Sequence, residues 1–348
     1  MTYYSLTNTA NMANFDQAVI RGLAPDRGLY FPSETPRLSG DFLQDLENKT
    51  AVKIGFEVMR PFVGGSIPDA RLRKIVEQTL CFEFPLVPIH NNVSTLELFH
   101  GPTMAFKDVG ARFMARCIGY FNEQNPKKVT VLVATSGDTG GAVASGFLGI
   151  EGTEVVILYP KGKVSHIQEL QITTNGKNIK AVEVDGVFDD CQEIVKTAFL
   201  DNDLNSAYNL TSANSINVAR WLPQSLYFFF AYQQLKKQGV DKDLVFSVPS
   251  GNFGNICAGI VASKLGLPVH HFVASTNVND TVPRYLQTQE YNPYPSKQTI
   301  SNAMDVGNPS NFIRIQSLFN NDFNELKQQF SSFAFDDSQT QIALKALY

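Results

Sequence analysis

The chain has 348 residues, of which 43% are hydrophobic and 18% charged, and its formal net charge is -4 at pH 7. This composition is typical of a folded globular protein and excludes a largely disordered chain. No block of basic residues is present, so nucleic acid is not an expected partner. The length is sufficient for two domains, each with its own hydrophobic core.

Sorting signals and metal-ligand patterns are also missing from the sequence. The amino terminus lacks the charged start and apolar core of a secretion signal, and no uninterrupted apolar run reaches membrane-spanning length. The cysteines form no C-x-x-C pair and the histidines have no metal-ligand spacing, so we predict neither a disulfide framework nor a metal site. We expect a protein of the reducing cytoplasm with no membrane partner.

The first patterned segment, residues 15–32, predicts a short helix that stops at Gly22, then a turn and an aromatic strand. Residues 40–81 alternate helical patterns with glycine and proline breaks. We therefore predict a mainly helical amino-terminal region over residues 1–85, followed by a second region over residues 86–348.

Lys107 follows an apolar run and precedes a helix predicted to begin at about Val109. Asp108 suits a helix amino terminus. The positive end of a helix dipole and the apolar neighbours Phe106 and Phe113 disfavour a charged ammonium group, so they favour the neutral amine that attacks a carbonyl. The alternative is an ordinary lysine whose ammonium group lies in water.

From Lys128 onward, short β-branched runs alternate with helical patterns. The predicted strands are Val129–Ala134, Glu154–Tyr159, Ile179–Val184, Leu244–Val248 and Val269–Ala274. The predicted helices are Thr139–Leu148, Ser165–Thr174, Phe188–Leu200, Ser215–Leu235 and Gly254–Leu265. This alternation predicts an α/β fold with parallel sheets, divided into a smaller subdomain at about 111–214 and a larger one at 215–348. Ligands of such folds bind at the carboxyl ends of the strands.

Two glycine-containing loops follow predicted strands at such positions. In the first, Ser136, Gly137, Asp138 and Thr139 combine small residues with hydroxyl groups beside a helix start, which suits a carboxylate. The alternative is a tight turn without a ligand.

The second loop suits a phosphate monoester, because its glycines let successive N–H groups converge at a helix start. Its residues are Gly251, Asn252, Phe253, Gly254 and Asn255. It matches neither the G-x-x-x-x-G-K-[ST] nor the G-x-G-x-x-G pattern, which argues against nucleoside triphosphates and dinucleotides.

Asn217 and Arg220 lie three residues apart on one predicted helix face. The Arg220 guanidinium could bind an oxyanion through two parallel hydrogen bonds. The alternative is an ion pair on a helix surface.

Taken together, the motifs His-Gly-Pro-Thr-x-Ala-Phe-Lys-Asp at 100–108, Ser-Gly-Asp-Thr-Gly at 136–140 and Ser-Gly-Asn-Phe-Gly-Asn at 250–255 resemble threonine synthase of the bacterial and fungal type. That family contains pyridoxal 5'-phosphate enzymes of fold type II, the fold of the tryptophan synthase β-subunit. The resemblance includes residues 22–30 and 215–220, so it extends over nearly the whole chain. Arg27 stands where the family usually has glycine.

The resemblance implies the roles of the candidate residues. Lys107 would bind the cofactor covalently, residues 251–255 would hold its phosphate, and residues 136–139 would lie by the substrate carboxylate and the cofactor ring. Asn217 and Arg220 are candidates for the substrate phosphate. The family reaction converts O-phospho-L-homoserine and water to L-threonine and phosphate, and Lys107 would act in it as acid and base.

This chain stops within a predicted helix that has no cap, whereas family members continue past this point. We therefore expect a fragment or a shortened chain. The segment beyond normally supplies a hydroxyl residue that faces the pyridine nitrogen. One alternative is another fold type II enzyme, such as a serine or threonine dehydratase or a cysteine synthase, although these carry Asn where Asp138 stands. Another is a catalytically silent homologue that binds a phosphorylated ligand or a partner protein. We expect a small-molecule substrate and a monomer.

Overall fold

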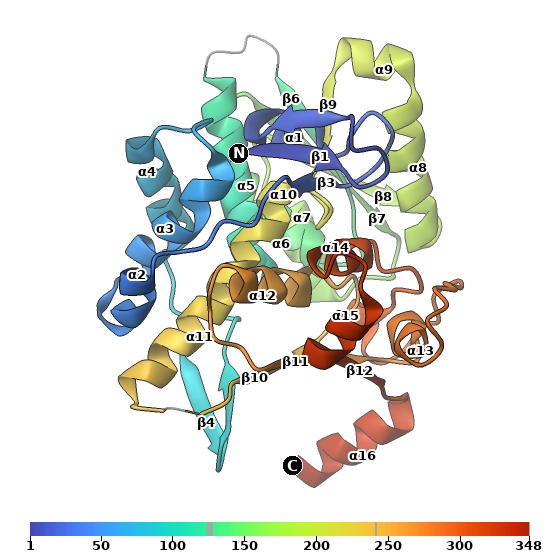
Figure 1. The fold of residues 1–348 in the computed structure, drawn as a ribbon. Coiled ribbons are helices and arrows are strands. Elements are labelled where there is room, and N and C mark those ends of the chain that lie inside the picture. Colours follow the sequence, from blue (N-terminus) through green and yellow to red (C-terminus); the bar gives the residue numbers. More distant parts are fainter. Residues whose placement is uncertain (124–127, 241, 348) are drawn as a thin grey trace.

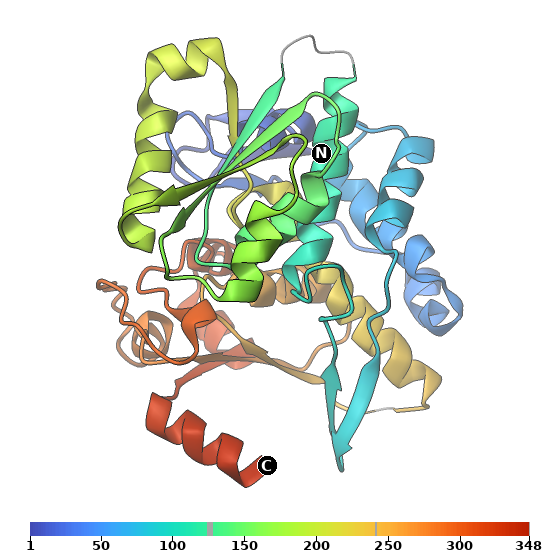
Figure 2. The same cartoon turned by 180° about the vertical axis from the view of Figure 1, so that it is seen from behind.

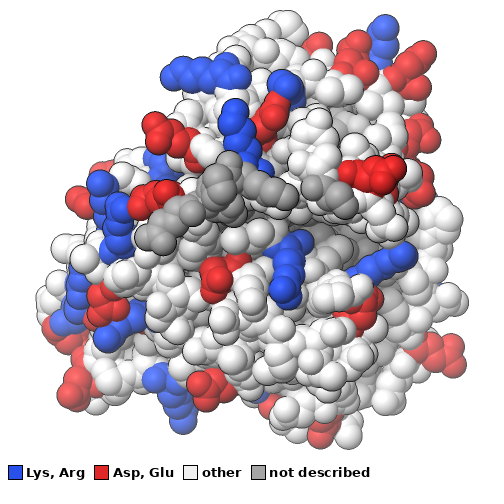
Figure 3. Space-filling model, turned by 90° about the horizontal axis from the view of Figure 1, so that it is seen from above, with Lys and Arg blue, Asp and Glu red and all other residues white. Residues whose placement is uncertain are grey.

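The computed structural model describes residues 1–123, 128–240 and 242–347, and its elements form two parallel sheets, helices around them and an amino-terminal region (Figure 1). This is the predicted α/β architecture. Within the described residues, no helix combines the length and the apolar character that a bilayer crossing requires. On the face that Figure 3 shows, basic and acidic side chains are interspersed outside the grey atoms.

The amino-terminal region contains a small antiparallel sheet in the order β2-β1-β3 as well as helices. Its elements are β1 (Thr2–Ser5), β2 (Met12–Asn14), α1 (Phe15–Arg21), β3 (Tyr30–Pro32), α2 (Gly40–Gln44), η1 (Leu46–Asn48), α3 (Ala51–Val63) and α4 (Asp69–Thr79). Helix α1 ends before Gly22, as predicted, because Gly22 adopts a φ of 72° that most side chains disfavour. Strands β1 and β2 were missed, since each is short and pairs only across the sheet.

The first parallel sheet has the order β8-β7-β6-β9 and carries the first glycine loop at its carboxyl edge. Its elements are α5 (Lys107–Asn122), β6 (Val129–Ala134), α6 (Asp138–Phe147), β7 (Thr153–Pro160), α7 (His166–Thr173), β8 (Ile179–Val184), α8 (Phe188–Leu200), α9 (Asn202–Ala207) and β9 (Asn209–Ser212). All three strands predicted here are present. Strand β9 was not predicted, because three of its four residues are polar and only its pairing with β6 defines it.

The second parallel sheet has the order β10-β11-β12. Its strands are β10 (Val245–Pro249), β11 (His271–Thr276) and β12 (Phe330–Ala334). The helices of this part are α12 (Gly254–Lys264), α13 (Thr281–Thr288), η3 (Asn302–Met304), α14 (Phe312–Leu318), α15 (Phe323–Gln329) and α16 (Asp337–Leu347). A hairpin of β4 (Leu86–His90) and β5 (Val93–Leu96) projects from the body (Figures 1 and 2).

The long helix predicted from Ser215 to Leu235 is divided into three pieces. They are α10 (Val218–Trp221), the 3-10 turn η2 (Leu222–Gln224) and α11 (Ser225–Lys237). Pro223 lies at the break, and a proline ring within a helix removes one backbone donor and clashes with the preceding turn. The prediction of a single uninterrupted helix was therefore wrong.

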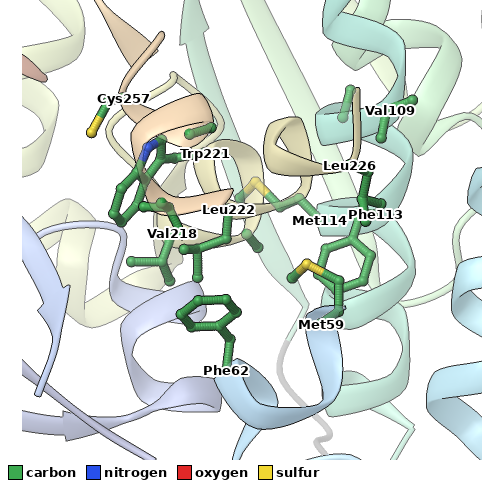
Figure 4. Close-up of a cluster of buried hydrophobic side chains, with 14 of the residues drawn as sticks. Met59, Phe62, Val109, Phe113, Met114, Val218, Trp221, Leu222, Leu226 and Cys257 are labelled. Atoms are coloured by element: carbon green, nitrogen blue, oxygen red, sulfur yellow. The ribbon is translucent and has the colours of Figure 1, made fainter. Parts of the chain in front are cut away.

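A continuous apolar core joins the amino-terminal region to both sheets. The side chains that Figure 4 labels come from α3, α5, α10, η2, α11 and α12, and all are buried: Met59, Phe62, Val109, Phe113, Met114, Val218, Trp221, Leu222, Leu226 and Cys257. Val109 and Phe113 lie in the first two turns of α5, which begins at Lys107, so the same core that joins the elements also fixes the start of α5.

Candidate active site

Lys107 is the first residue of α5, two residues earlier than the predicted start at Val109. Its side chain is 22% exposed, and Nζ lies 3.4 Å from Oδ2 of Asp138. Burial lowers the pKa of Lys107, and the nearby positive charge of Arg220 lowers it further, whereas the Asp138 carboxylate acts in the opposite direction. The direction of this shift agrees with the prediction of a lysine that is readily neutral.

The segment before Lys107 is held by a buried carboxylate. Asp108 accepts hydrogen bonds from Thr103, at 3.0 Å from the backbone nitrogen and 2.6 Å from the hydroxyl oxygen. A Cβ atom at Gly101 would lie 2.5 Å from Asp108 Oδ2, so glycine is required for this close approach. The Tyr227 hydroxyl on α11 donates to the carbonyl of Phe106. Lys107 therefore extends from a backbone that is fixed on both sides.

The first glycine loop, Thr135–Gly141, joins β6 to α6. Its turn is closed by the Thr135 hydroxyl oxygen, which accepts from the amides of Gly137 and Gly140, each at 2.9 Å. Three other amide groups of this loop make no hydrogen bond within the described residues: Ser136, Asp138 and Thr139. Free N–H groups at a helix start are suited to a small anion such as a carboxylate.

The second glycine loop, Ser250–Asn255, joins β10 to α12. The amide groups of residues 251–255 make no hydrogen bond to the described parts of the chain, and they lie where α12 begins. Phe253 holds a φ of 59°, and a Cβ atom at Gly251 would lie 2.9 Å from the carbonyl oxygen of Ala303. Such a row of amides fits a phosphate group.

The Asn252 side chain fastens this loop to its neighbours. Its Nδ2 donates to Oγ of Ser215 at 2.7 Å, and its Oδ1 accepts from the Ser310 amide at 2.6 Å. The Asn311 amide groups donate to the Asn252 carbonyl. Residues from three separate parts of the chain thus shape the second glycine loop.

Asn217 and Arg220 lie in the interior and not on a surface, so the surface ion pair is excluded. Asn217 donates to the Val19 carbonyl at 2.8 Å and accepts from the Ala219 amide at 3.0 Å. Arg220 is 3% exposed and donates to the Ala213 carbonyl, while its Nε has no hydrogen-bond partner within the described residues. Burial lowers the pKa of Arg220 to about 10. Their role toward the substrate phosphate stays a prediction.

Sequence reasoning missed several side chains that hold this site together. Gln168 on α7 donates to Oδ1 of Asp138 at 2.7 Å, and Gln171 on the same helix donates to the Thr103 carbonyl at 3.3 Å. Ser310 and Asn311 contact the second glycine loop, as described above. A glutamine pair three residues apart on a predicted helix was the one visible signal, but it does not show what the pair contacts.

The fold and the two loops define a class of protein. Residues 85–324 match the family described as "Pyridoxal-phosphate dependent enzyme", and residues 2–80 match "Threonine synthase N terminus". This is a pyridoxal phosphate enzyme of fold type II, and the free amides of the second glycine loop fit the phosphate of that cofactor.

Individual relatives narrow the class further. The chain is 45% identical to threonine synthase of Haemophilus influenzae, over 100% of this chain and 80% of that protein. The crystal structure of threonine synthase from Escherichia coli superposes with a TM-score of 0.92 at 43% identity and covers 100% of this chain and 80% of that one. The "PLP bound" threonine synthase from Brucella melitensis gives 0.92 at 36% identity, over 100% and 82% of the two chains.

The chain belongs to the threonine synthase family and is a pyridoxal-phosphate-dependent lyase. The predicted fold, enzyme class and cofactor are confirmed. The identity supports this family over the dehydratases and cysteine synthases that the sequence left as alternatives.

Proposed function

We propose that Lys107 binds pyridoxal phosphate covalently and moves the protons of the threonine synthase reaction. The observation that carries this proposal is the position of Nζ, largely buried at the start of α5 and 3.4 Å from the Asp138 carboxylate. Because burial lowers the pKa of Lys107, a larger fraction of its amine is neutral and able to attack a carbonyl.

The second glycine loop would hold the cofactor phosphate through the amides of Gly251, Asn252, Phe253, Gly254 and Asn255. What supports this assignment is that these amides are free and lie at the amino terminus of α12, an 11-residue helix. When bound, pyridoxal phosphate supplies an electron sink for the carbanion character that develops in the substrate.

The substrate of this proposal is O-phospho-L-homoserine. The free amides of Ser136, Asp138 and Thr139, together with Gly137 in the turn, suit its carboxylate. Arg220 suits its phosphate, since its buried guanidinium leaves Nε without a partner among the described residues and acts on Lys107 electrostatically. Asn217 would act through the start of α10, whose Ala219 amide it caps.

Lys107, once the substrate amino group has released it from the cofactor, would take up the α proton of the substrate, give that proton up again within the site, and only then take up a β proton. Phosphate would leave from the γ carbon, and water would add at the β carbon to give L-threonine. Each time Lys107 accepts a proton it becomes an ammonium group, and the Asp138 carboxylate stabilises that charge. The fixed backbone on both sides of Lys107 keeps one base within reach of successive protons.

Borohydride reduction of the cofactor-supplied protein, followed by peptide mapping, tests this proposal. We expect a stable cofactor adduct on Lys107 and release of threonine and phosphate from O-phospho-L-homoserine but no turnover of serine. Absence of the adduct would contradict the assignment of Lys107. An adduct without turnover would indicate the catalytically silent homologue.

The proposal also covers the division of the chain into regions, its oligomeric state and its cellular compartment. We propose an amino-terminal region over 1–85, a smaller subdomain at about 111–214 and a larger one at 215–348, a division supported by the two separate parallel sheets. We further propose a monomer that acts on its small-molecule substrate in the cytoplasm. Sedimentation equilibrium of the purified protein tests the oligomeric state.

A further inference from the structure

Helix α7 carries two glutamines that reach the two sides of the Lys107 site. Gln168 and Gln171 are three residues apart and so lie on one face of the helix. Gln168 Nε2 donates to Oδ1 of Asp138 at 2.7 Å, and Gln171 Nε2 donates to the Thr103 carbonyl at 3.3 Å. Elsewhere α7 is open to solvent, with Ile167 61% exposed and Leu170 44% exposed. The inner face of α7 therefore consists mainly of these two glutamines and the buried Ile172.

The backbone of the first glycine loop leaves room for both glutamines. A Cβ atom at Gly137 would lie 2.4 Å from Cδ of Gln168, and one at Gly141 would lie 2.8 Å from Oε1 of Gln171. Gly137 also has a φ of 141°, a conformation that other residues rarely adopt. Two glycines thus allow the loop to approach the amides of α7 closely.

The orientation of the Gln168 amide is determined at both ends. Its Oε1 accepts from the Ser165 amide at 3.1 Å in the capping box of α7, so its Nε2 is directed to Asp138. One Asp138 oxygen is thereby occupied by Gln168, and the other faces Lys107 at 3.4 Å. The Asp138 side chain is 37% exposed, so without Gln168 it is free to turn toward water.

We propose that Gln168 is a positioning residue that holds the Asp138 carboxylate toward Lys107, while Gln171 fixes the segment before Lys107 from the same helix face. This inference rests on the proposed role of Lys107. It assigns α7 a function that neither glycine loop has, which is to set the distance between the base and the carboxylate that stabilises its protonated form. The charged groups that influence Lys107 are Asp138 on α6 and Arg220 on α10.

In the test, the full chain without cofactor is treated with cyanate, a small probe that carbamylates neutral amines. The pH dependence of labelling at Lys107 is followed by peptide mass spectrometry in Gln168→Leu, in Asp138→Asn and in the double variant. Loss of the carboxylate lowers the pKa of Lys107. At pH values below the midpoint of the labelling curve of Lys107, we therefore expect labelling to accelerate by about three- to tenfold in Asp138→Asn. Gln168→Leu shifts the midpoint in the same direction, and the double variant shows no shift beyond Asp138→Asn.

One further variant separates positioning from a general loss of structure. Ile167→Ala, on the exposed face of α7, is the control and leaves the midpoint unchanged. Circular dichroism confirms the fold of each variant.

A Gln168→Leu midpoint equal to that of the unmodified chain would overturn the inference, as would a shift that persists in the Asp138→Asn background. Neither result affects the borohydride adduct on Lys107. Conversely, absence of that adduct would refute the proposed function while leaving the labelling comparison readable.

Discussion

At the residue scale, burial and two side chains decide what Lys107 can do. Asp138 stabilises its protonated form, Arg220 disfavours it, and burial in the site favours the neutral amine. Asp108 plays a different part, because it faces Thr103 and fixes the preceding backbone. Lys107 and Asp108 are adjacent in sequence, yet Lys107 is directed to Asp138 and Asp108 to Thr103.

Replacement of Lys107 by alanine removes the proposed base. We expect turnover of O-phospho-L-homoserine to fall by more than about a thousandfold, because both covalent attachment and proton transfer are lost. The fold should persist, since the apolar residues of α5 remain. Steady-state kinetics and circular dichroism measure the two effects. Lys163→Ala, at an exposed position between β7 and α7, is the control, and measurable turnover in Lys107→Ala would contradict the mechanism.

Replacement of Asn252 by aspartate places negative charge beside the proposed phosphate site. It also removes the donor to the Ser215 hydroxyl. We expect the affinity for pyridoxal phosphate to fall by about tenfold or more. Fluorescence titration of the cofactor-free protein measures the dissociation constant. Asn292→Asp, at an exposed position, makes the same change of charge elsewhere, and equal affinities of the two variants would mean that the second glycine loop does not bind the phosphate.

At the element scale, the close packing of α5 against α10 places Lys107 near Arg220. A Cβ atom at Gly110 would lie 2.5 Å from the Arg220 carbonyl oxygen, whereas one at Gly119, on the same helix, would meet only the side chain of Ile150 at 2.9 Å. A backbone atom cannot move aside as a side chain can. A side chain at Gly110 would therefore push α5 and α10 apart, whereas one at Gly119 would displace only the Ile150 side chain.

Gly110→Ala is expected to destabilise the protein by about 1–3 kcal/mol, since the two helices must separate despite the better helix propensity of alanine. Turnover should fall as well, because Lys107 lies one turn away. Gly119→Ala is the matched control and is expected to cost less than Gly110→Ala in the free energy of unfolding. Urea denaturation of both variants makes the comparison. A Gly110→Ala protein as stable as the unmodified chain would show that the α5–α10 distance is adjustable.

At the scale of the whole molecule, Arg314 on α14 links distant parts of the chain. It is fully buried and donates to the carbonyls of Tyr30 at 2.9 Å and Ile216 at 2.6 Å, and to Oδ1 of Asn311 at 2.7 Å. Its guanidinium also lies 4.3 Å from the centre of the Trp221 ring. Through Asn311 these contacts reach the second glycine loop. One side chain thus connects β3, the segment before α10 and the loop proposed to hold the cofactor phosphate.

Arg314→Met retains much of the side-chain volume but leaves buried carbonyls without donors. We expect a loss of about 2–5 kcal/mol in the free energy of unfolding and weaker retention of pyridoxal phosphate. Arg314→Lys should recover little, because an ammonium group cannot reproduce the planar set of donors. Urea denaturation and cofactor titration are the measurements. Full stability of Arg314→Met would mean that these contacts are dispensable.

The sequence alone determined much of this protein. Apolar and β-branched periodicity is local, so it indicated β6, β7, β8, β10 and β11 and the helices α6, α7, α8 and α12. The glycine motifs indicated both loops, and the apolar run before a helix start singled out Lys107. Only the tertiary structure decided the rest. Three examples are the pairing of β9 with β6, the approach of Arg220 to Lys107 and the contact of Gln168 with Asp138. They join residues about 30 to 110 positions apart. No local pattern encodes such contacts, because they depend on how separate elements pack around a common core.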